Sequence, residues 1–317
     1  MSLKKALHAS IRRLDTFINL PYEAKSEENL KKSEARLLLP GTLKLIKLWL
    51  TRKDNTQIKY NFAVVIIVKN EAQYLKEWLN YYLSLGVDHF YIYDNGSDDN
   101  ILEIVDLYKK KVTYTKFLGT AKQMDAYNDA LNKYGKACRY MAFLDADEFI
   151  YVKDEKKGLL ELLEEYFADK NVGGLAINWQ IFGSSNLEKK PQGLLTDNFV
   201  YRSQTDFIKN RHIKSIISPA KTVGFMNDPH GAYYLPGYYA INEKKEIVNG
   251  PFTKSVNTNV IRINHYFTKS KAEFLQKKAR GRATKNSQRT KQDFIDHDKN
   301  DVFDDSMRIY NHIKNLE

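Results

Sequence analysis

Hydrophobic and polar residues follow two different periods along residues 62–147. The continuous apolar run FAVVIIV at 62–68 predicts a strand that is buried on both faces. Apolar residues then recur every three or four positions through 72–82, which predicts an amphipathic helix. The same succession repeats, with strands predicted at 89–94, 112–117 and 139–146 and helices at 101–111 and 121–135. This alternation predicts an α/β fold with a mostly parallel sheet covered by helices on both faces.

Polar residues before two of these helices predict N-terminal caps, namely Asn70 for the first helix and Ser97 for the second. Beyond residue 147 the pattern is less regular, and residues 183–260 are rich in loops. Further elements are predicted as a helix at 158–167, strands at 172–182, 214–218, 221–225 and 259–267, and a basic helix at 270–283. The chain therefore divides into a basic helical extension at 1–60, an α/β domain at 61–268 and a basic helical segment at 269–317.

The N-terminal extension contains the segment GTLKLIKLWL, which has the pattern of an amphipathic helix. Lys44 and Lys47 share one helical face, and Leu43, Ile46 and Leu50 lie on another. Two interpretations stay open: the helix lies on an anionic membrane surface, or it packs on the main domain with its lysines in solvent.

Composition narrows the class of protein. The 317 residues are 43% hydrophobic, which suffices for a sizeable core, and the single cysteine, Cys138, indicates a reducing compartment. The chain has neither a signal-peptide pattern nor an apolar run of about 18–20 residues, so we expect a cytoplasmic protein. Such a protein could also bind peripherally to the inner face of the cell membrane.

The net charge of +11 is concentrated in two segments. Residues 1–60 hold 13 Lys and Arg against 6 Asp and Glu, and residues 269–291 hold 9 against a single Glu. Nucleic acid, anionic lipid and phosphorylated substrates would each explain such segments. We expect no nucleic-acid partner, because one cysteine excludes zinc-finger spacing and no aromatic-glycine RNA-binding signature is present.

Three acids interrupt the apolar stretch FLDADEFI at 143–150. If 139–146 is a strand, Asp145 and Asp147 point to the same side at its carboxyl end, the edge where open α/β sheets bind ligands. Two converging carboxylates repel each other, and a bound Mn²⁺ or Mg²⁺ ion removes that repulsion. A lone Asp-x-Asp is also a common turn signal.

Three motifs in order place this pair in context: VKNE at 68–71, DNGSDD at 94–99 and DAD at 145–147. Together with NWQIFGSSN, IKSII and INHYFTKSKAEFLQKKARG, they make residues 62–283 resemble the family 2-like glycosyltransferases grouped with glycosyltransferase family 92. The resemblance implies a GT-A fold, in which a nucleotide-binding, Rossmann-like mixed sheet is flanked by helices. It also implies inverting transfer of a sugar from a nucleotide sugar, most often a UDP-sugar, to a glycan, lipid-linked or glycoprotein acceptor in cell-surface polysaccharide or glycoconjugate synthesis.

The resemblance also assigns roles to individual residues. The donor-binding residues that it implies are Val68, Asn70, Glu71, Asp94, Gln123, Asp145, Lys269, Lys277 and Arg280. Asp145, Asp147 and His265 are the implied ligands of Mn²⁺ or Mg²⁺. Lys277 and Arg280 lie three residues apart, on one face of the basic helix, and cations there would stabilise a departing diphosphate.

An inverting transfer also needs a general base for the acceptor hydroxyl. The Glu-Asp pair that supplies it in many family 2 enzymes is not evident here. Asp228, beside a histidine in MNDPHG, is the preferred candidate, and Asp197, Asp206 and Glu148 are alternatives. An inactive glycosyltransferase-like scaffold in a glycan-assembly complex remains a second hypothesis for the whole chain.

Overall fold

The computed structural model describes residues 57–154, 157–226, 228–279 and 289–316, together with the helical positions 43, 46, 47 and 50. Most of the N-terminal extension, including Lys44, lies outside the described residues, and so does Arg280. The helices are α3 (Ala72–Ser84), α4 (Ile101–Leu107), α5 (Gln123–Tyr134), α6 (Leu159–Tyr166), α7 (Leu195–Asn198), α8 (Lys271–Ala279), α9 (Lys291–His297) and α10 (Ser306–Lys314). The division of the chain into three parts stays a prediction.

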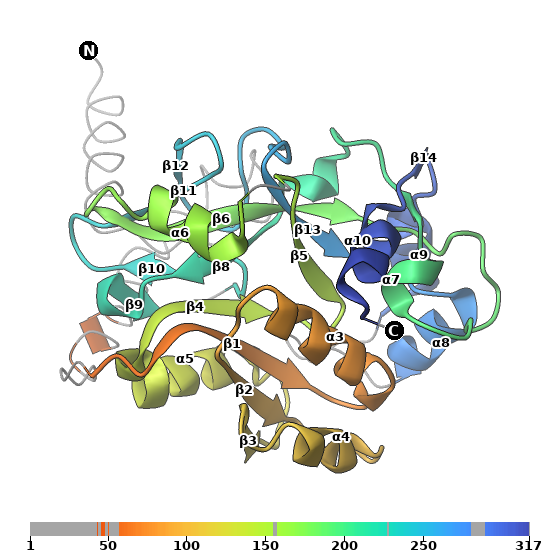
Figure 1. Cartoon of the computed structure of the whole chain (residues 1–317), viewed down its shortest axis with the longest axis horizontal. Coiled ribbons are helices and arrows are strands. Elements are labelled where there is room, and N and C mark those ends of the chain that lie inside the picture. Colours follow the sequence, from red (N-terminus) through yellow and green to blue (C-terminus); the bar gives the residue numbers. More distant parts are fainter. Residues whose placement is uncertain are drawn as a thin grey trace.

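A mixed sheet forms the centre of the described part of the chain (Figure 1). Its strands run in the order β12 (Ile247–Val248), β11 (Tyr239–Ile241), β6 (Val172–Ile181), β8 (Ile213–Ile217), β4 (Cys138–Leu144), β1 (Tyr60–Val68), β2 (His89–Asp94) and β3 (Val112–Lys116). The strands β4, β1, β2 and β3 are parallel, as predicted, whereas β8 is antiparallel to both of its neighbours. The fold class predicted from the sequence, a mixed α/β sheet flanked by helices, is confirmed.

Strand β1 shows why its run of apolar residues is continuous. Phe62, Val64 and Ile66 belong to the core on the side of α3, α4 and α6, while Ala63 and Val65 pack with α5 on the opposite side. Successive side chains of a strand point to opposite faces, so a strand between two helical layers needs apolar residues at every position.

A second group of strands joins the sheet beside β6. Strand β13 (Ile261–His265) pairs in parallel with β6 and antiparallel with β5 (Glu148–Val152), and this brings His265 directly opposite Glu148. The remaining short strands are β7 (Tyr201–Arg202), β9 (Thr222–Gly224), β10 (Tyr233–Tyr234) and β14 (Val302–Phe303). Strands β14 and β7 pair with each other and hold the C-terminal segment against the domain.

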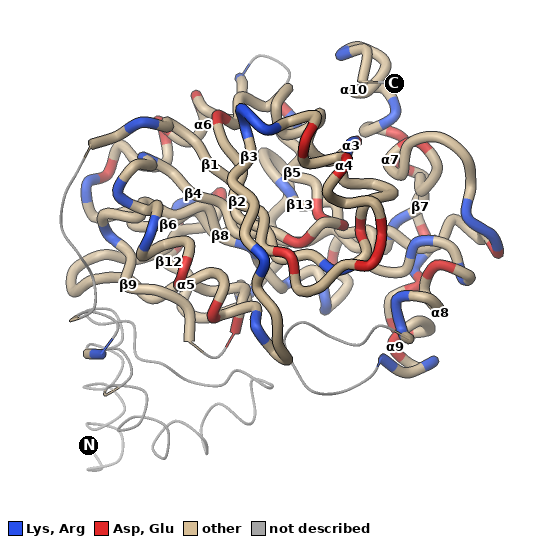
Figure 2. Tube along the Cα trace, turned by 90° about the horizontal axis from the view of Figure 1, so that it is seen from below, with Lys and Arg blue, Asp and Glu red and all other residues tan. Residues whose placement is uncertain are grey.

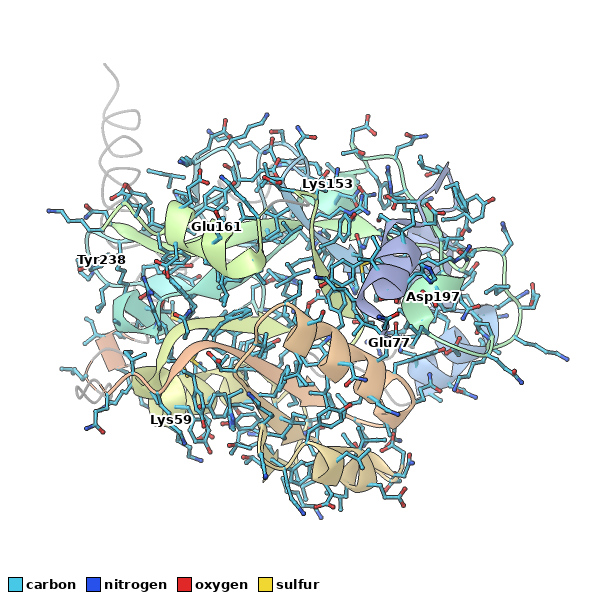
Figure 3. The ribbon with its side chains drawn as sticks, viewed as in Figure 1. Lys59, Glu77, Lys153, Glu161, Asp197 and Tyr238 are labelled. Carbon is cyan, nitrogen blue, oxygen red and sulfur yellow. The ribbon has the colours of Figure 1, made fainter. Side chains whose placement is uncertain are left out.

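Side-chain contacts also join helices that are distant in the sequence. Glu77 of α3 accepts hydrogen bonds from the backbone N–H groups of Leu195 and Thr196 (2.6 and 3.0 Å). Asn311 of α10 donates to Asp197 of α7 (2.7 Å), and Glu77 and Asp197 lie in the same region of the molecule (Figure 3). Asp197, one of the candidate bases, thus belongs to the junction of α3, α7 and α10.

Both predicted helix caps are wrong. Asn70 has a positive φ of 56° and precedes the N-cap residue Glu71, and the side chain that accepts the N–H of Ala72 is Asp99 of the next loop (2.9 Å). Helix α4 begins at Ile101, so Ser97 lies outside it and does not cap it. Both side chains instead tie together the loops that follow β1 and β2.

The described part of the C-terminal segment at 269–317 carries acids as well as basic residues. Glu273 lies among the lysines of α8, and Asp293 and Asp296 belong to α9 (Figure 2). No helix in the described ranges has the length and apolar character needed to cross a membrane.

Candidate functional site

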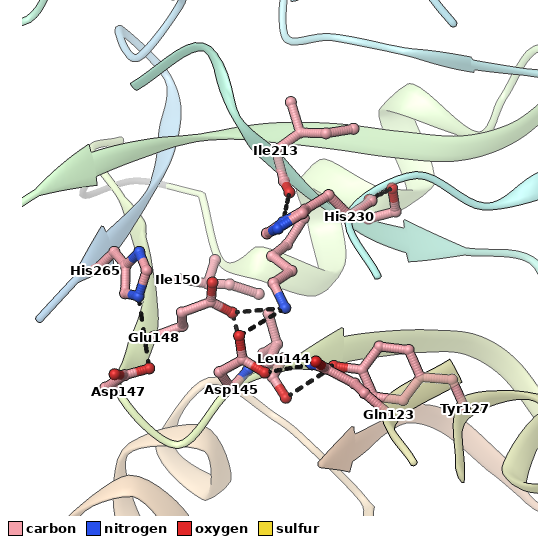
Figure 4. Close-up of polar contacts among 12 residues, drawn as sticks. Gln123, Tyr127, Leu144, Asp145, Asp147, Glu148, Ile150, Ile213, His230 and His265 are labelled. Atoms are coloured by element: carbon pink, nitrogen blue, oxygen red, sulfur yellow. Dashed lines mark hydrogen bonds and ion pairs between the residues drawn. The ribbon is translucent and has the colours of Figure 1, made fainter. Parts of the chain in front are cut away.

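The acidic motif lies in a turn at the carboxyl end of β4. Strand β4 ends at Leu144, two residues earlier than predicted, and β5 begins at Glu148. Strand alternation therefore does not set the directions of Asp145 and Asp147, and that part of the sequence argument is wrong. The turn gives the two carboxylates different partners, which Figure 4 shows on either side of Glu148.

Asp145 is held by two side chains from different elements. Gln123, at the start of α5, donates to Oδ1 of Asp145 (2.7 Å), and Lys214 of β8 donates to Oδ2 (3.0 Å). The Asp145 side chain nevertheless stays 33% exposed. Burial alone would raise its pKa, but the positive charge of Lys214 outweighs that effect and lowers the pKa below the ordinary value. Asp145 is thus a fixed, ionised acceptor that a ligand can reach.

Lys214 and Glu148 form a buried layer behind Asp145. Both side chains are 0% exposed, and their Nζ and Oε2 atoms lie 3.5 Å apart. Glu148 Oε2 also accepts the backbone N–H of Asp145 (2.9 Å), which fixes the shape of the turn. Burial raises the pKa of Glu148 well above its ordinary value. Burial would lower the pKa of Lys214, but the negative charges of Asp145 and Glu148 raise it well above its ordinary value.

Sequence reasoning did not assign a role to Lys214. Its signal was a single lysine inside the apolar strand IKSII, because a lysine is rarely buried without an acidic partner. The acids in FLDADEFI required a buried cation, and Lys214 supplies it.

Asp147 is surrounded by basic groups. Lys277 of α8 donates to its Oδ2 atom, and Nε2 of His265 lies 3.6 Å from Oδ1. Burial would raise the pKa of Asp147, but Lys277 and His265 together lower it well below the ordinary value. Burial lowers the pKa of His265, so the imidazole is favoured in its neutral, metal-competent form.

Of the three predicted metal ligands, the structure brings together Asp147 and His265, whereas Asp145 bonds to Lys214. Within the described ranges, no group of three or more His, Cys, Asp and Glu side chains is arranged to hold a metal ion. The Asp147 carboxylate nevertheless fits Mn²⁺ or Mg²⁺, which commonly use one or two protein carboxylates and complete their coordination with phosphate oxygens and water, and a neutral imidazole is a common metal ligand beside it.

The ends of β1 and β2 carry the predicted nucleoside-binding residues. Val68 is buried, and its carbonyl accepts the N–H of Asn95 (2.8 Å). Asp94 is also buried and accepts hydrogen bonds from Ser97 and from the hydroxyl of Tyr114 (2.6 Å). The carboxylate that was predicted to bind the base is therefore already hydrogen-bonded within the protein.

Asn70 connects the same two loops from the other side. Its backbone N–H donates to Ser97 Oγ (2.9 Å), and its side-chain carbonyl accepts the N–H of Asp98 (2.8 Å). Together with Asp94 and Ser97, it forms a rigid wall at the carboxyl edge of β1 and β2.

Lys269 also reaches this edge, between the wall and Asp147. Its buried side chain donates to Glu71 (3.1 Å) and lies over the ring of Tyr74, and its backbone has a positive φ of 52°. Its charge also helps to lower the pKa of Asp147. The structure therefore gathers Glu71, Asp147, Lys269 and Lys277 at one site.

The predicted base Asp228 lies in the loop that follows β9. Its Oδ1 atom accepts the backbone N–H of His230 (2.8 Å), which is the geometry of an Asx turn. Its side chain is 40% exposed and lies 4.0 Å from Nε2 of His230. Of the alternatives, Asp206 is exposed in a turn of the loop after β7.

Comparison with known proteins gives one family. The family model described as glycosyltransferase family 92 matches residues 62–297. A family 92 protein of Ricinus communis is 28% identical over 224 residues, which cover 67% of this chain and 38% of the relative. One of Oryza sativa subsp. japonica is 26% identical over 211 residues, with 65% and 33% coverage. The chain thus spans between 33% and 38% of the length of these relatives.

Similarity to solved structures is lower. TarS 1–349 of S. aureus, in complex with UDP, shares 18% identity at a TM-score of 0.36, with 50% of this chain and 47% of that chain covered. Glucosyl-3-phosphoglycerate synthase of Mycobacterium tuberculosis, in complex with Mn²⁺, UDP and glucosyl-3-phosphoglycerate, shares 10% identity at a TM-score of 0.26, with 43% and 48% covered.

Proposed function

Because this chain belongs to glycosyltransferase family 92, we propose that it transfers a sugar from a nucleotide sugar to a glycan acceptor. The observation that carries the proposal is the arrangement at the carboxyl edge of β4. There the partly exposed Asp145 is held by Lys214 and Gln123, and Asp147 is held by Lys277 and His265. Such an edge, with fixed carboxylates and buried cations side by side, suits a ligand that has both hydroxyl groups and a diphosphate.

The donor would lie along the wall formed by Asn70, Asp94 and Ser97. In this proposal Asp145 accepts hydrogen bonds from sugar hydroxyls, since its carboxylate is fixed in place and ionised. Gln123 and Lys214 keep it there without reorganisation when the donor binds.

The leaving nucleoside diphosphate gains negative charge as the glycosidic bond breaks. Lys269 and Lys277 stand at Asp147 to stabilise this charge, and their ammonium groups are largely shielded from water, where electrostatic interactions are stronger. Arg280 remains a predicted contributor from outside the described residues. A Mn²⁺ or Mg²⁺ ion held by Asp147 and His265 would add positive charge at the same diphosphate.

We propose inversion at the anomeric carbon, by direct attack of an acceptor hydroxyl on the face opposite the diphosphate. A UDP-sugar is the first donor to test, and a glycan, lipid-linked or glycoprotein acceptor in surface polysaccharide or glycoconjugate synthesis is the corresponding acceptor class. Action in the cytoplasm, at the inner face of a membrane, is part of the same proposal; the exposed side chains of Leu43, Ile46 and Leu50 are its structural motivation.

The alternative function, an inactive scaffold, differs in one measurable respect. A scaffold would bind a nucleotide sugar without consuming it, or would not bind it at all. The ionised state of Asp145 and Asp147, together with the buried lysines Lys214 and Lys277 that bond to them, favours the enzyme, because strongly shifted pKa values and buried charges of this kind are concentrated at functional sites.

A donor screen tests the proposal. The full chain is incubated with UDP-glucose, UDP-galactose and UDP-N-acetylglucosamine, with and without Mn²⁺, and released UDP is measured. We expect one donor to be consumed faster with Mn²⁺ and Asp147→Asn to abolish that gain. Asp125→Asn is the matched control, because Asp125 is an exposed aspartate that forms an ion pair with Lys122 at the surface. Equal turnover of every donor by Asp147→Asn and the unmodified chain would refute the assignment.

A further inference from the structure

An aromatic wall that contains three histidines stands above the acidic turn. The ring of Trp179, on β6, has His212 stacked on it (4.8 Å between ring centroids), His230 at its edge (4.8 Å) and His265 tilted against it (4.2 Å). His265 belongs to the donor site through Asp147. The proposed donor site leaves His212 and His230 without a role.

The hydrogen bonds of His230 determine which ring nitrogen carries the proton. Nδ1 lies 3.0 Å from the carbonyl oxygen of Ile213, and a carbonyl can only accept. Nδ1 must therefore carry the hydrogen, and the neutral ring has its free electron pair on Nε2. That nitrogen lies 4.0 Å from Asp228 Oδ1, and the His230 side chain is 14% exposed.

The loop that carries His230 is held in a fixed position. Ser215 donates to the carbonyl oxygen of His230 (3.0 Å), and Asp228 accepts its backbone N–H. At Gly231 a Cβ atom would come within 2.8 Å of the carbonyl oxygen of Gly250, so the two loop backbones are closely packed. A base must be positioned in this way before it can act in a transition state.

His230 is also close to the acid that the donor is proposed to contact. Burial and then the charge of Lys214 lower the pKa of His230 to about 3, while Asp145 acts in the opposite direction. The imidazole is consequently neutral at physiological pH and able to accept a proton. Figure 4 shows His230 above Asp145, on the other side of Glu148 from His265.

We propose that His230, and not the predicted Asp228, is the base that accepts the proton of the acceptor hydroxyl, an inference that rests on the proposed glycosyl transfer. The acceptor O–H bond breaks and its proton moves to Nε2 of His230. The freed electron pair of the acceptor oxygen forms the bond to the anomeric carbon. The bond from that carbon to the diphosphate oxygen breaks, and its electron pair leaves with the nucleoside diphosphate. The imidazolium later releases the proton to solvent.

A weakly basic imidazole suffices for this step. As the acceptor oxygen bonds to an electron-poor anomeric carbon, its hydroxyl becomes strongly acidic, so the proton is transferred late. Asp228 then has a second function beyond its turn: its carboxylate, beside Nε2, stabilises the imidazolium as it forms.

The test uses the donor that the full chain consumes fastest, with water as the acceptor, and follows UDP release. His230→Asn is the sharpest variant, because the Asn amide can still donate to Ile213 but has no group at the Nε2 position. We expect kcat to fall by about 10²–10⁴-fold, while the Kd for UDP changes by less than about twofold. In His230→Ala, added imidazole should restore part of the lost rate.

His212→Asn is the matched control, since His212 packs on the same tryptophan and its Nδ1 also meets a backbone carbonyl, that of Lys209 (2.9 Å). It should retain activity within about tenfold. The inference is overturned if His230→Asn keeps its rate, if both variants lose activity equally, or if UDP binding weakens as much as turnover. An unmodified chain that neither binds UDP nor consumes any donor would instead contradict the proposed function itself.

Discussion

Replacing Lys214 by Met removes the cation that lies between Asp145 and Glu148. Methionine keeps most of the length and apolar volume of lysine, so packing changes little. The two carboxylates would then remain near or inside the core without their shared counter-charge. The perturbation is therefore chiefly electrostatic.

We expect Lys214→Met to lower the free energy of unfolding at neutral pH by about 3–5 kcal/mol, which is the usual cost of removing one partner of a buried ion pair. The matched control is Lys133→Met. Lys133 forms an ion pair with Asp129 at 2.9 Å, nearly the same distance as Lys214 to Asp145, but its side chain is 54% exposed. Such a surface pair contributes about 1 kcal/mol or less, so burial is what separates the two variants.

The cost should depend on pH in a defined window. The lowered pKa of Asp145 gives stability that is present above its ordinary value of 3.8 and is lost as the pH falls through the folded-state pKa. The raised pKa of Lys214 gives stability that is present below 10.5 and is lost as the pH rises through its folded-state pKa. The difference between Lys214→Met and the unmodified chain should thus be largest between these limits and shrink in acid.

Urea unfolding followed by circular dichroism measures both effects. Adding Glu148→Gln to Lys214→Met should recover part of the lost stability, because it removes one of the two carboxyl groups that Lys214 no longer compensates. The electrostatic explanation is wrong if Lys214→Met lowers the free energy of unfolding no more than Lys133→Met does. It is also wrong if the losses of unfolding free energy caused by Lys214→Met and Glu148→Gln simply add in the double variant.

Two further predictions concern the frame around the site. Asp304 forms ion pairs with Arg202 (2.6 Å) and with the buried Arg262 (2.9 Å). Asp304→Asn should lower the free energy of unfolding in urea titrations by about 3–5 kcal/mol, because Arg262 would keep an uncompensated charge. An unchanged urea midpoint would contradict this prediction. Gly174→Ala should cost about 1–3 kcal/mol, measured by thermal unfolding, since a Cβ at this position collides with the ring and hydroxyl of the buried Tyr234. If Gly174→Ala has the same melting temperature as the unmodified chain, Tyr234 moves aside freely and the prediction is wrong.

The strands and helices of the first half could be predicted because local patterns determine them. The run at 62–68 is buried on both faces in the structure, and the apolar stripe at 72–82 lies within α3. Both patterns depend on neighbours in the sequence and on a single packing surface. The same reasoning correctly predicted that the acidic motif lies at the carboxyl edge of β4.

The parts that could not be predicted depend on partners far away in the chain. The N–H group of Ala72 donates a hydrogen bond to Asp99 of another loop, so residues 68–72 alone do not reveal that cap. Lys214 and Asp145 are 69 positions apart and meet because β8 is antiparallel to β4. The polarity of β8 is a property of the whole sheet and leaves no local signal.

The acidic motif itself shows the limit most clearly. In the sequence, Asp145 and Asp147 looked like one pair that shares a metal ion, because a strand would point them to the same side. The turn after Leu144 separates their surroundings, with Lys214 and Gln123 at Asp145 and Lys277 and His265 at Asp147. The role of Asp147 in metal binding is still a proposal, and it can be tested by itself.

Calorimetric titration of UDP into the full chain, with and without Mn²⁺, measures metal-assisted nucleotide binding separately from turnover. We expect Mn²⁺ to strengthen UDP binding, Asp147→Asn to lose this increment and Asp125→Asn to keep it. The assignment of Asp147 as a metal ligand at the nucleotide site is wrong if UDP does not bind, or if Asp147→Asn shows the same Mn²⁺-dependent gain in affinity as the unmodified chain.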